Sequence, residues 1–444
     1  IRSGARLGID SAAAIGDGTV TVDAGGGVFV RIGDGNTISN DFTIAGEGWL
    51  QSAGRLGALR LISGDVTGDV TLAGDARITA WTNQGGDIDG VISDGGQGYS
   101  LEKTGSGSIT LNGLNTYGGA TKLSGGTLYV GTLADGGTAS SIGQSSSDAS
   151  NLVFAGGTLG YTGGSVTIDR NFQFANGSNN TIRVGKSDAT LTLSGTSPSS
   201  TGSLIKTGAG TLELTGAHNY TGLTNVAQGT LLFSGNASLT STATSGVYGG
   251  RMLIGNGATL KFDTTTNQTL SGVISGAGQL IKDGTSELTL NAYNTYSGGT
   301  TVDGGTLWLG KGGSTGTIRG SLTVNSGATV DYLTGNTFGW VRGASVNALT
   351  INGGTVGGAD FGNHFWNSFN LTMNGGELIL GGTVNEFHRP TITVTNNARI
   401  SQVSSDAIFG MRDGQRTTVN VSDGKTLTID AALTQRYGTA SLDV

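Results

Sequence analysis

The sequence holds few side chains that could support acid–base or metal chemistry. Its three histidines, His218, His364 and His388, show neither the His-Glu-x-x-His nor the His-x-His spacing of a metal site. Cysteine is absent, which excludes disulfides and thiolate-bound metals. We therefore expect no metal and no cofactor. We interpret His218 as a turn residue, because asparagine occupies the corresponding place in a related stretch of the chain.

One short stretch matches a catalytic motif by letter. Residues Gly312–Gly316 read Gly-Gly-Ser-Thr-Gly, the Gly-x-Ser-x-Gly pattern of a nucleophilic serine. That motif requires a strand before the serine and a helix after it, and no helical pattern follows here. In so glycine-rich a chain we interpret the match as chance. A Ser-His-Asp triad built from distant parts of the sequence stays open, because its members need only spatial proximity.

Acidic residues could serve a polysaccharide-active enzyme, which would need carboxylates, or a base with a nearby cation, clustered on one face. The candidates are Asp87, Asp89, Asp406 and the neighbouring Arg412 and Asp413. Aspartate beside glycine more often forms turns. The segment 85–90, Gly-Gly-Asp-Ile-Asp-Gly, is also a single partial copy of a calcium-binding nonapeptide pattern. We predict that the protein is not an enzyme, and keep a β-helical polysaccharide-active enzyme as an alternative.

The composition points to many short strands joined by tight turns. The 444 residues include 83 glycines and 2 prolines, and 12% are charged, about half the share usual in globular proteins. The formal net charge of -7 is spread thinly and no basic stripe occurs, so we expect no nucleic-acid partner. No apolar run approaches the ~18 residues of a membrane-spanning helix.

Three long stretches repeat one pattern, at residues 99–131, 202–235 and 278–310. Each contains a lysine, then a tyrosine fourteen residues later, then the glycine of a Gly-Thr-Leu twenty-three residues after the lysine. The lysine–tyrosine pairs are Lys103 and Tyr117, Lys206 and Tyr220, and Lys282 and Tyr296. We interpret these as structural positions concerned with stacking rather than with binding.

A simpler unit fills residues 320–430. It reads strand, tight turn, strand, as in Leu349-Thr-Ile-Asn-Gly-Gly-Thr-Val356, and recurs every 21–27 residues. Asn325, Asn352 and Asn374 occupy the same place in three successive units. Stacked units would align them as an amide ladder that satisfies the polar groups of the turns. The alternative is a row of ligand-binding amides.

The short repeat predicts the fold. Apolar and polar residues alternate with period two, which indicates half-buried strands. A unit of this length is too short to bury its own apolar face, so neighbouring units must stack. We therefore predict an all-β protein: one continuous parallel β-helix over residues 1–444, an elongated rod of about twenty rungs at ~4.8 Å spacing. The alternative is a β-sandwich of hairpins. We expect residues 135–150 to form a surface loop.

Two further surface features arise from the sequence. Between Phe338 and Phe387 the aromatic residues are concentrated, and 362–369 could be a loop with an aromatic tip. The candidate contact surface comprises Trp340, Phe361, His364, Phe365 and Trp366. The alternative is a wide rung filled by stacked aromatic rings. Thr-x-Thr pairs occur at 190/192, 391/393 and 426/428, a residue pattern found in surface-binding arrays. We discount such an array because the pairs are scattered along the chain.

The long repeats resemble the autotransporter-associated β-strand repeat, also called the passenger-associated transport repeat. The first copy carries its motif at 103–107, 115–119 and 125–128, and the third at 282–284, 294–298 and 304–307. The middle copy departs from it, with His218 where the others have asparagine, and the third has Ser286-Glu287 where Gly-Thr is usual.

The resemblance implies a passenger region of a Gram-negative autotransporter. Such passengers are usually right-handed parallel β-helices, displayed at the cell surface or released, and the repeat is associated with their export. A C-terminal membrane β-barrel would be expected. Its segments are absent from this sequence, so we expect membrane attachment only through a barrel removed from the chain or beyond Val444.

The function expected from this resemblance is adhesion, cell–cell aggregation or biofilm attachment. The partner would be a protein or glycan on a host or neighbouring cell, or another copy of the chain. The alternative is a purely structural role, as a stalk or as the subunit of an extracellular fibre, because a solenoid can associate end to end.

Overall fold

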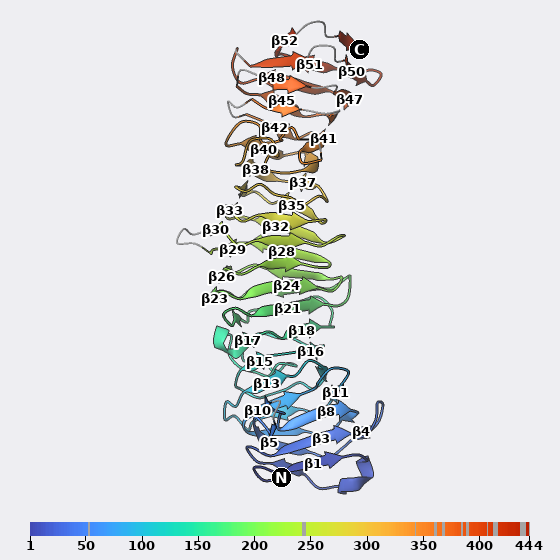
Figure 1. The fold of residues 1–444 in the computed structure, drawn as a ribbon, viewed down its shortest axis with the longest axis vertical. Coiled ribbons are helices and arrows are strands. Elements are labelled where there is room, and N and C mark those ends of the chain that lie inside the picture. Colours follow the sequence, from blue (N-terminus) through green and yellow to red (C-terminus); the bar gives the residue numbers. More distant parts are fainter. Residues whose placement is uncertain are drawn as a thin grey trace. The chain divides into compact units, whose positions relative to one another are not determined.

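The computed structural model describes residues 1–51, 54–241, 246–341, 343–358, 362–365, 369–382, 385–387, 390–405, 407–411, 416–435 and 441–443. The chain forms two compact units, Ile1–Gly222 and Leu223–Val444. Each is a parallel β-solenoid without an α-helix among its described residues (Figure 1). The solenoid has about seventeen turns, near the twenty expected, which confirms the all-β, right-handed parallel β-helix class. One continuous domain over residues 1–444 stays a prediction.

The first unit is built from stacked parallel strands. One sheet contains β1 (Arg6–Ile9), β3 (Gly27–Arg31), β8 (Leu59–Ser63), β10 (Val70–Thr79), β13 (Leu101–Thr104), β15 (Thr121–Leu123), β17 (Leu152–Phe154) and β20 (Gln173–Phe174). Strands β5 (Phe42–Gly46) and β12 (Ile92–Ser93) also pair with β10, and β2 (Val20–Val22) pairs with β5. A second contains β4 (Thr37–Ile38), β9 (Asp65–Val66), β11 (Gly85–Ile88), β14 (Ser108–Leu111), β16 (Thr127–Val130), β18 (Thr158–Tyr161), β21 (Asn179–Val184) and β24 (Ser203–Thr207).

Shorter elements complete this unit. They are β19 (Val166–Ile168), β22 (Thr190–Leu193) and β25 (Thr211–Leu214) in one stack, β23 (Ser197–Ser200) and β26 (Ala217–Tyr220) in another, the antiparallel pair β6 (Leu50–Gln51) and β7 (Gly54–Arg55), and the 3₁₀ turns η1 (Ala12–Ile15) and η2 (Ala149–Asn151). Between β16 and η2 no strand forms, so most of the loop expected at 135–150 is present, while its last two residues begin the 3₁₀ turn η2.

The second unit repeats this plan. One stack contains β28 (Thr230–Gly235), β32 (Thr259–Thr264), β35 (Gln279–Asp283), β37 (Thr300–Val302), β39 (Gly320–Asn325), β41 (Val346–Asn352), β44 (Asn370–Asn374), β47 (Thr391–Asn396), β50 (Arg416–Val421) and β53 (Ser441–Asp443). Another contains β30 (Val247–Tyr248), β33 (Gln268–Leu270), β36 (Glu287–Leu290), β38 (Gly305–Leu309), β40 (Ala328–Tyr332), β42 (Thr355–Val356), β45 (Glu377–Leu380), β48 (Ala398–Gln402) and β51 (Leu427–Ile429).

The remaining strands of this unit are β27 (Thr224–Val226), β31 (Met252–Ile254) and β34 (Ile274–Gly276), then β43 (His364–Phe365), β46 (Asn385–Phe387), β49 (Ile408–Met411) and β52 (Ala432–Gln435), and the short β29 (Ser238–Leu239).

Alternation along each strand builds the core of every turn. In β41, Leu349 and Ile351 point inward and are fully buried, while Thr350 between them points outward. Leu349 stands in register with Leu322 on one side and Leu371 on the other. Since each such leucine contributes about 1.5–3 kcal/mol by burial, the stacked apolar columns stabilise the solenoid turn by turn.

Candidate functional site

The lysines of the long repeats point into the core. Lys103, on β13, is 1% exposed, and its aliphatic stem stands in register between Ile78 and Leu123. Its ammonium group lies at the end of the strand. It donates to the carbonyl oxygens of Thr104 (2.8 Å), Gly107 (2.9 Å), Gly125 (3.1 Å) and Gly105 (3.3 Å). Because Gly125 follows the neighbouring strand β15, one ammonium ties two successive turns together.

The other two repeats place their lysines in the same way. Lys282 is fully buried and donates to the carbonyls of Asp283, Gly284 (3.1 Å) and Gly304 (3.2 Å). Lys206 is also fully buried, and donates to the carbonyls of Thr207 and Gly208, both at 2.8 Å. Burial lowers the pKa of each of the three ammonium groups to about 8.

The Gly-Thr-Leu glycine is required by the same arrangement. Gly126 and Gly305 have φ of 59° and 60°, a region that favours glycine. A Cβ atom at Gly126 would lie 2.1 Å from the carbonyl oxygen of Gly107, one of the oxygens that Lys103 holds. At Gly305 it would lie 2.8 Å from the Lys282 Nζ. The spacing between lysine and glycine therefore reflects close contact between neighbouring turns.

The asparagine and tyrosine of the repeat are internal as well. Asn115 is buried; its Oδ1 accepts from the Ile92 amide and its Nδ2 donates to the Ser141 carbonyl, both at 2.8 Å. The buried Tyr117 hydroxyl lies 2.6 Å from the Thr121 hydroxyl. In the third copy Asn294 and Tyr296 make the corresponding bonds, to Ile274, Thr317 and Thr300. Partners cannot reach these side chains.

His218 replaces this asparagine in the middle copy and lies on strand β26, so its interpretation as a turn residue was wrong. It is fully buried, its ring stacks on Phe172 at 5.4 Å, and its Nδ1 lies 3.1 Å from the Ser197 hydroxyl. Its Nε2 has no hydrogen-bond partner in the described part of the chain. Burial lowers the pKa of His218 to about 3, so the ring stays neutral at physiological pH. Without a carboxylate partner and without solvent access, this Ser–His pair is not a catalytic centre.

The other candidates for chemistry do not assemble a site among the described residues. No helix follows Ser314, as a nucleophile motif would require. The amide of Asp87 donates to Asp65 Oδ1 at 2.8 Å, and Asp89 Oδ1 accepts from Asn112 at 2.7 Å, so both residues link neighbouring turns. No group of three potential metal ligands occurs among the residues that the structure describes. The positions outside the described residues are His388, Asp406, Arg412 and Asp413.

The aromatic segment is described only in part. Phe361 and Trp366 lie outside the described residues, while His364 and Phe365 form β43, which pairs with β46. Trp340 is half-buried, and its amide donates to the Ser314 carbonyl at 2.8 Å. Two other aromatics of this region, Phe338 and Phe369, are in the core. A contact role for the candidate surface stays a prediction.

The asparagines of the simpler units form a short ladder. Asn352 Nδ2 donates to Asn325 Oδ1 at 2.9 Å, as an amide ladder requires, and Asn325 Nδ2 donates to Asp303 Oδ1 at 2.6 Å. The exposed Asn374 accepts from the Thr395 hydroxyl at 3.1 Å. This ladder runs along one margin of the outer sheet face in the second unit.

Beside this ladder lies a column of threonines that the sequence analysis missed. Five occupy one outward position on consecutive strands of a single sheet, each in register with the next: Thr301, Thr323, Thr350, Thr372 and Thr393. None of their hydroxyls has a hydrogen-bond partner in the described part of the chain. Of the Thr-x-Thr pairs considered above, only Thr393 belongs to this column. The informative signal was the second residue of each simpler unit.

A buried arginine organises the loop between β16 and η2. Arg170 is 1% exposed and its guanidinium donates to the carbonyls of Ala134 (2.9 Å), Gly143 (3.0 Å) and Ser145 (3.1 Å). Burial lowers its pKa from the usual value. The loop is therefore a fixed part of the fold. Its arginine lies on a neighbouring turn, so no local pattern in the loop could indicate it.

Comparison with known proteins agrees with these features. The Passenger-associated-transport-repeat family matches residues 101–130, 204–233 and 280–309. Over 335 residues, 68% of this chain, the sequence is 36% identical to the adhesin BmaC autotransporter of Brucella suis biovar 1 (strain 1330). The matched region is 9% of that relative's length. No solved structure matches the chain at a significant level. Among the described residues, no helix has the length and apolar character needed to cross a membrane.

Replacing a repeat lysine should destabilise the fold without affecting the outer faces. In Lys103→Met the apolar stem is kept, but the carbonyls of Thr104, Gly105 and Gly125 lose the ammonium as donor, at about 1–3 kcal/mol for an unpaired polar group. The Gly107 carbonyl keeps the Thr127 amide. We expect the free energy of unfolding in urea to fall by about 2 kcal/mol. The matched control is Lys186→Met, at an exposed lysine of the same unit. Equal stability of the two variants would contradict the structural role.

The buried lysines also predict how stability depends on pH. Their pKa is about 8 in the folded chain against 10.5 for an ordinary lysine, so above pH 8 the unfolded chain binds more protons. The free energy of unfolding should therefore rise between about pH 8 and pH 10. Above pH 10 it should fall again, because burial raises the pKa of Tyr117, Tyr248 and Tyr296. Denaturation across this range checks the rise, which the triple Lys→Met variant should lack.

Proposed function

Because this chain is an autotransporter passenger region with three passenger-associated transport repeats, we propose that it works as an adhesin on the outside of a Gram-negative cell. It would attach the cell to a host surface, to neighbouring cells or to a biofilm. The relative that matches 68% of this chain is named an adhesin. Its partner would be a protein or glycan of such a surface, or another copy of the chain.

The threonine column is the observation that carries this proposal. Five hydroxyls at about 4.8 Å spacing form a rigid outer face, bordered by the Asp303–Asn325–Asn352 ladder. Each hydroxyl can both donate and accept a hydrogen bond. A single bond contributes only about 0.5–1.5 kcal/mol, but a row fixed by the sheet can engage one surface at several points without ordering any loop.

The buried positions support the same interpretation. The repeat-position lysines Lys103, Lys206 and Lys282, with Asn115, Asn294, Tyr117, Tyr220 and Tyr296, are committed to the interior. The groups left for contact are therefore those of the outer sheet faces. One of these faces carries the hydroxyls of the threonine column and the Asn325–Asn352 amide pair. A surface of this kind is suited to contact rather than to turnover.

Removing hydroxyls from the column should reduce adhesion. The triple variant Thr323→Val, Thr350→Val, Thr372→Val keeps the β-branched shape on strands β39, β41 and β44. With the chain displayed on a non-adherent bacterium, we expect binding to cultured host cells, or aggregation of the bacteria, to fall about tenfold.

The control is a second row of threonines on the neighbouring sheet, which is also in register. It is the triple variant Thr306→Val, Thr329→Val, Thr355→Val, and we expect it to adhere like the parent. Surface display of all variants is measured by antibody labelling. Unchanged adhesion by the first variant at equal display would contradict the proposal and favour a purely structural stalk.

A further inference from the structure

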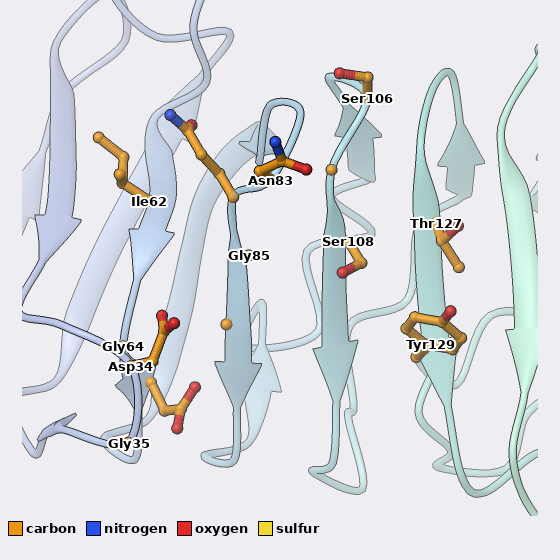
Figure 2. Close-up of a pocket in the computed structure, with 14 residues that line it drawn as sticks. Asp34, Gly35, Ile62, Gly64, Asn83, Gly85, Ser106, Ser108, Thr127 and Tyr129 are labelled. Atoms are coloured by element: carbon orange, nitrogen blue, oxygen red, sulfur yellow. The ribbon is translucent and has the colours of Figure 1, made fainter.

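A polar groove of about 630 Å³ lies on the outer face of the first unit. It crosses successive strands, so residues distant in sequence meet along it. Figure 2 shows Asp34 and Gly35 near one end, Asn83 and Ser108 in the middle, and Tyr129 at the other end. With strands about 4.8 Å apart, the span from β9 over β11 and β14 to β16 is about 14 Å, enough for an extended ligand.

The floor of the groove is bare backbone because side chains cannot fit there. A Cβ atom on Gly86 would lie 2.2 Å from the carbonyl oxygen of Gly64, and one on Gly85 would lie 2.4 Å from that of Ser108. Glycine at these positions allows the strands of adjacent turns to pack. Gly85 leaves the groove open between the side chains at its two ends, whereas Gly86 is in register with the buried Ile109 and faces the core.

The side-chain amide of Gln84 lines the middle of the groove, and Arg60 holds it in place. Arg60 lies between two aromatic rings, 5.7 Å from the centroid of Phe29 and 5.5 Å from that of Trp81. It donates to Gln84 Oε1 at 2.9 and 3.3 Å, and this oxygen also accepts from the Trp81 amide at 3.3 Å. The Gln84 Nε2 has no partner in the described part of the chain, and is left to donate to a ligand.

Tyr129 provides an aromatic surface at the far end. It points outward from β16, in register with Gly160 on β18. A Cβ atom on Gly160 would lie 2.5 Å from Tyr129 Cδ1, so the ring occupies the space that a side chain there would fill. The ring is half-buried, and its hydroxyl has no hydrogen-bond partner among the described residues. An apolar ligand face could stack on it.

The charges of the groove restrict its ligand. Asp34 and Asp65 are the charged residues that line it, and no lysine or arginine does. One oxygen of Asp65 accepts from the Asp87 amide at 2.8 Å, which leaves the other to accept from a ligand. Two carboxylates favour a ligand rich in hydroxyl donors and repel sulfate or carboxylate groups.

We propose that this groove binds a neutral, unsulfated oligosaccharide. Sugar hydroxyls would pair with Asp34, Asp65 and Gln84, and the apolar face of one sugar ring would stack on Tyr129. The proposal rests on the adhesin function, because a chain that works as a surface adhesin comes into contact with the glycans of other cells. The groove and the threonine column lie in different units, so their variants separate the two ideas.

The test uses the purified 444-residue chain and titration calorimetry. The probes are four neutral tetrasaccharides, of β-1,4-glucose, β-1,3-glucose, α-1,4-glucose and β-1,4-N-acetylglucosamine, and one heparin tetrasaccharide. We expect at least one neutral probe to bind, and heparin not to bind. Tyr129→Ala should weaken that binding about tenfold, and Gln84→Ala should weaken it several-fold.

Two control variants separate recognition from stability. Tyr129→Phe keeps the ring and should bind within about threefold of the parent. Tyr293→Ala removes a tyrosine that is 51% exposed in the other unit, and should bind like the parent. Failure of all neutral probes, preference for heparin, or unchanged binding by both Tyr129→Ala and Gln84→Ala would overturn the groove proposal. Adhesion that persists without glycan binding would leave the adhesin function standing.

Discussion

The first and third long repeats each depend on one buried ammonium group that holds the carbonyls of two successive turns. A buried charge is costly unless hydrogen bonds replace its water. Here the oxygens come from glycine-rich turns, and the Gly107 carbonyl also accepts from the Thr127 amide of the next turn at 3.1 Å. The lysine and the turns therefore satisfy one another, and the glycines allow the approach.

This arrangement separates the interior of the solenoid from its surface. The buried lysines, asparagines and tyrosines at the repeat positions, together with Arg170, are committed to internal bonds that fix turns and loops. Some outer-face side chains link neighbouring turns, as Arg77 and Glu102 do. Others, such as the threonine column, have no internal partner in the described chain and can be selected for contact. The threonine column in one unit and the glycine-floored groove in the other are two results of that freedom.

The sequence predicted the class of fold because it depends on local patterns: period-two alternation and a unit too short to fold alone. The Asn325–Asn352 contact followed from the same repeat. That the Lys103 side chain points into the core could not be predicted from the sequence. Lysine is seldom buried, and residue spacing alone does not show which side chains face the core. The threonine column was visible in the Leu-Thr pattern of the simpler units, but a Thr-x-Thr pair lies within one strand, whereas the column forms between strands. The groove depends on several turns and on absent side chains, which no single stretch of sequence reveals.

Amide hydrogen exchange, measured by mass spectrometry on the intact chain, tests the central role of the buried lysines most directly. The account predicts that peptides covering the turns 104–107 and 124–127, which Lys103 ties together, exchange much more slowly than the turn 325–328 of a simpler unit, which has no lysine. The third repeat should show the same protection at 283–286 and 303–305. Equal exchange in the lysine-held turns and the simpler turn would contradict the account.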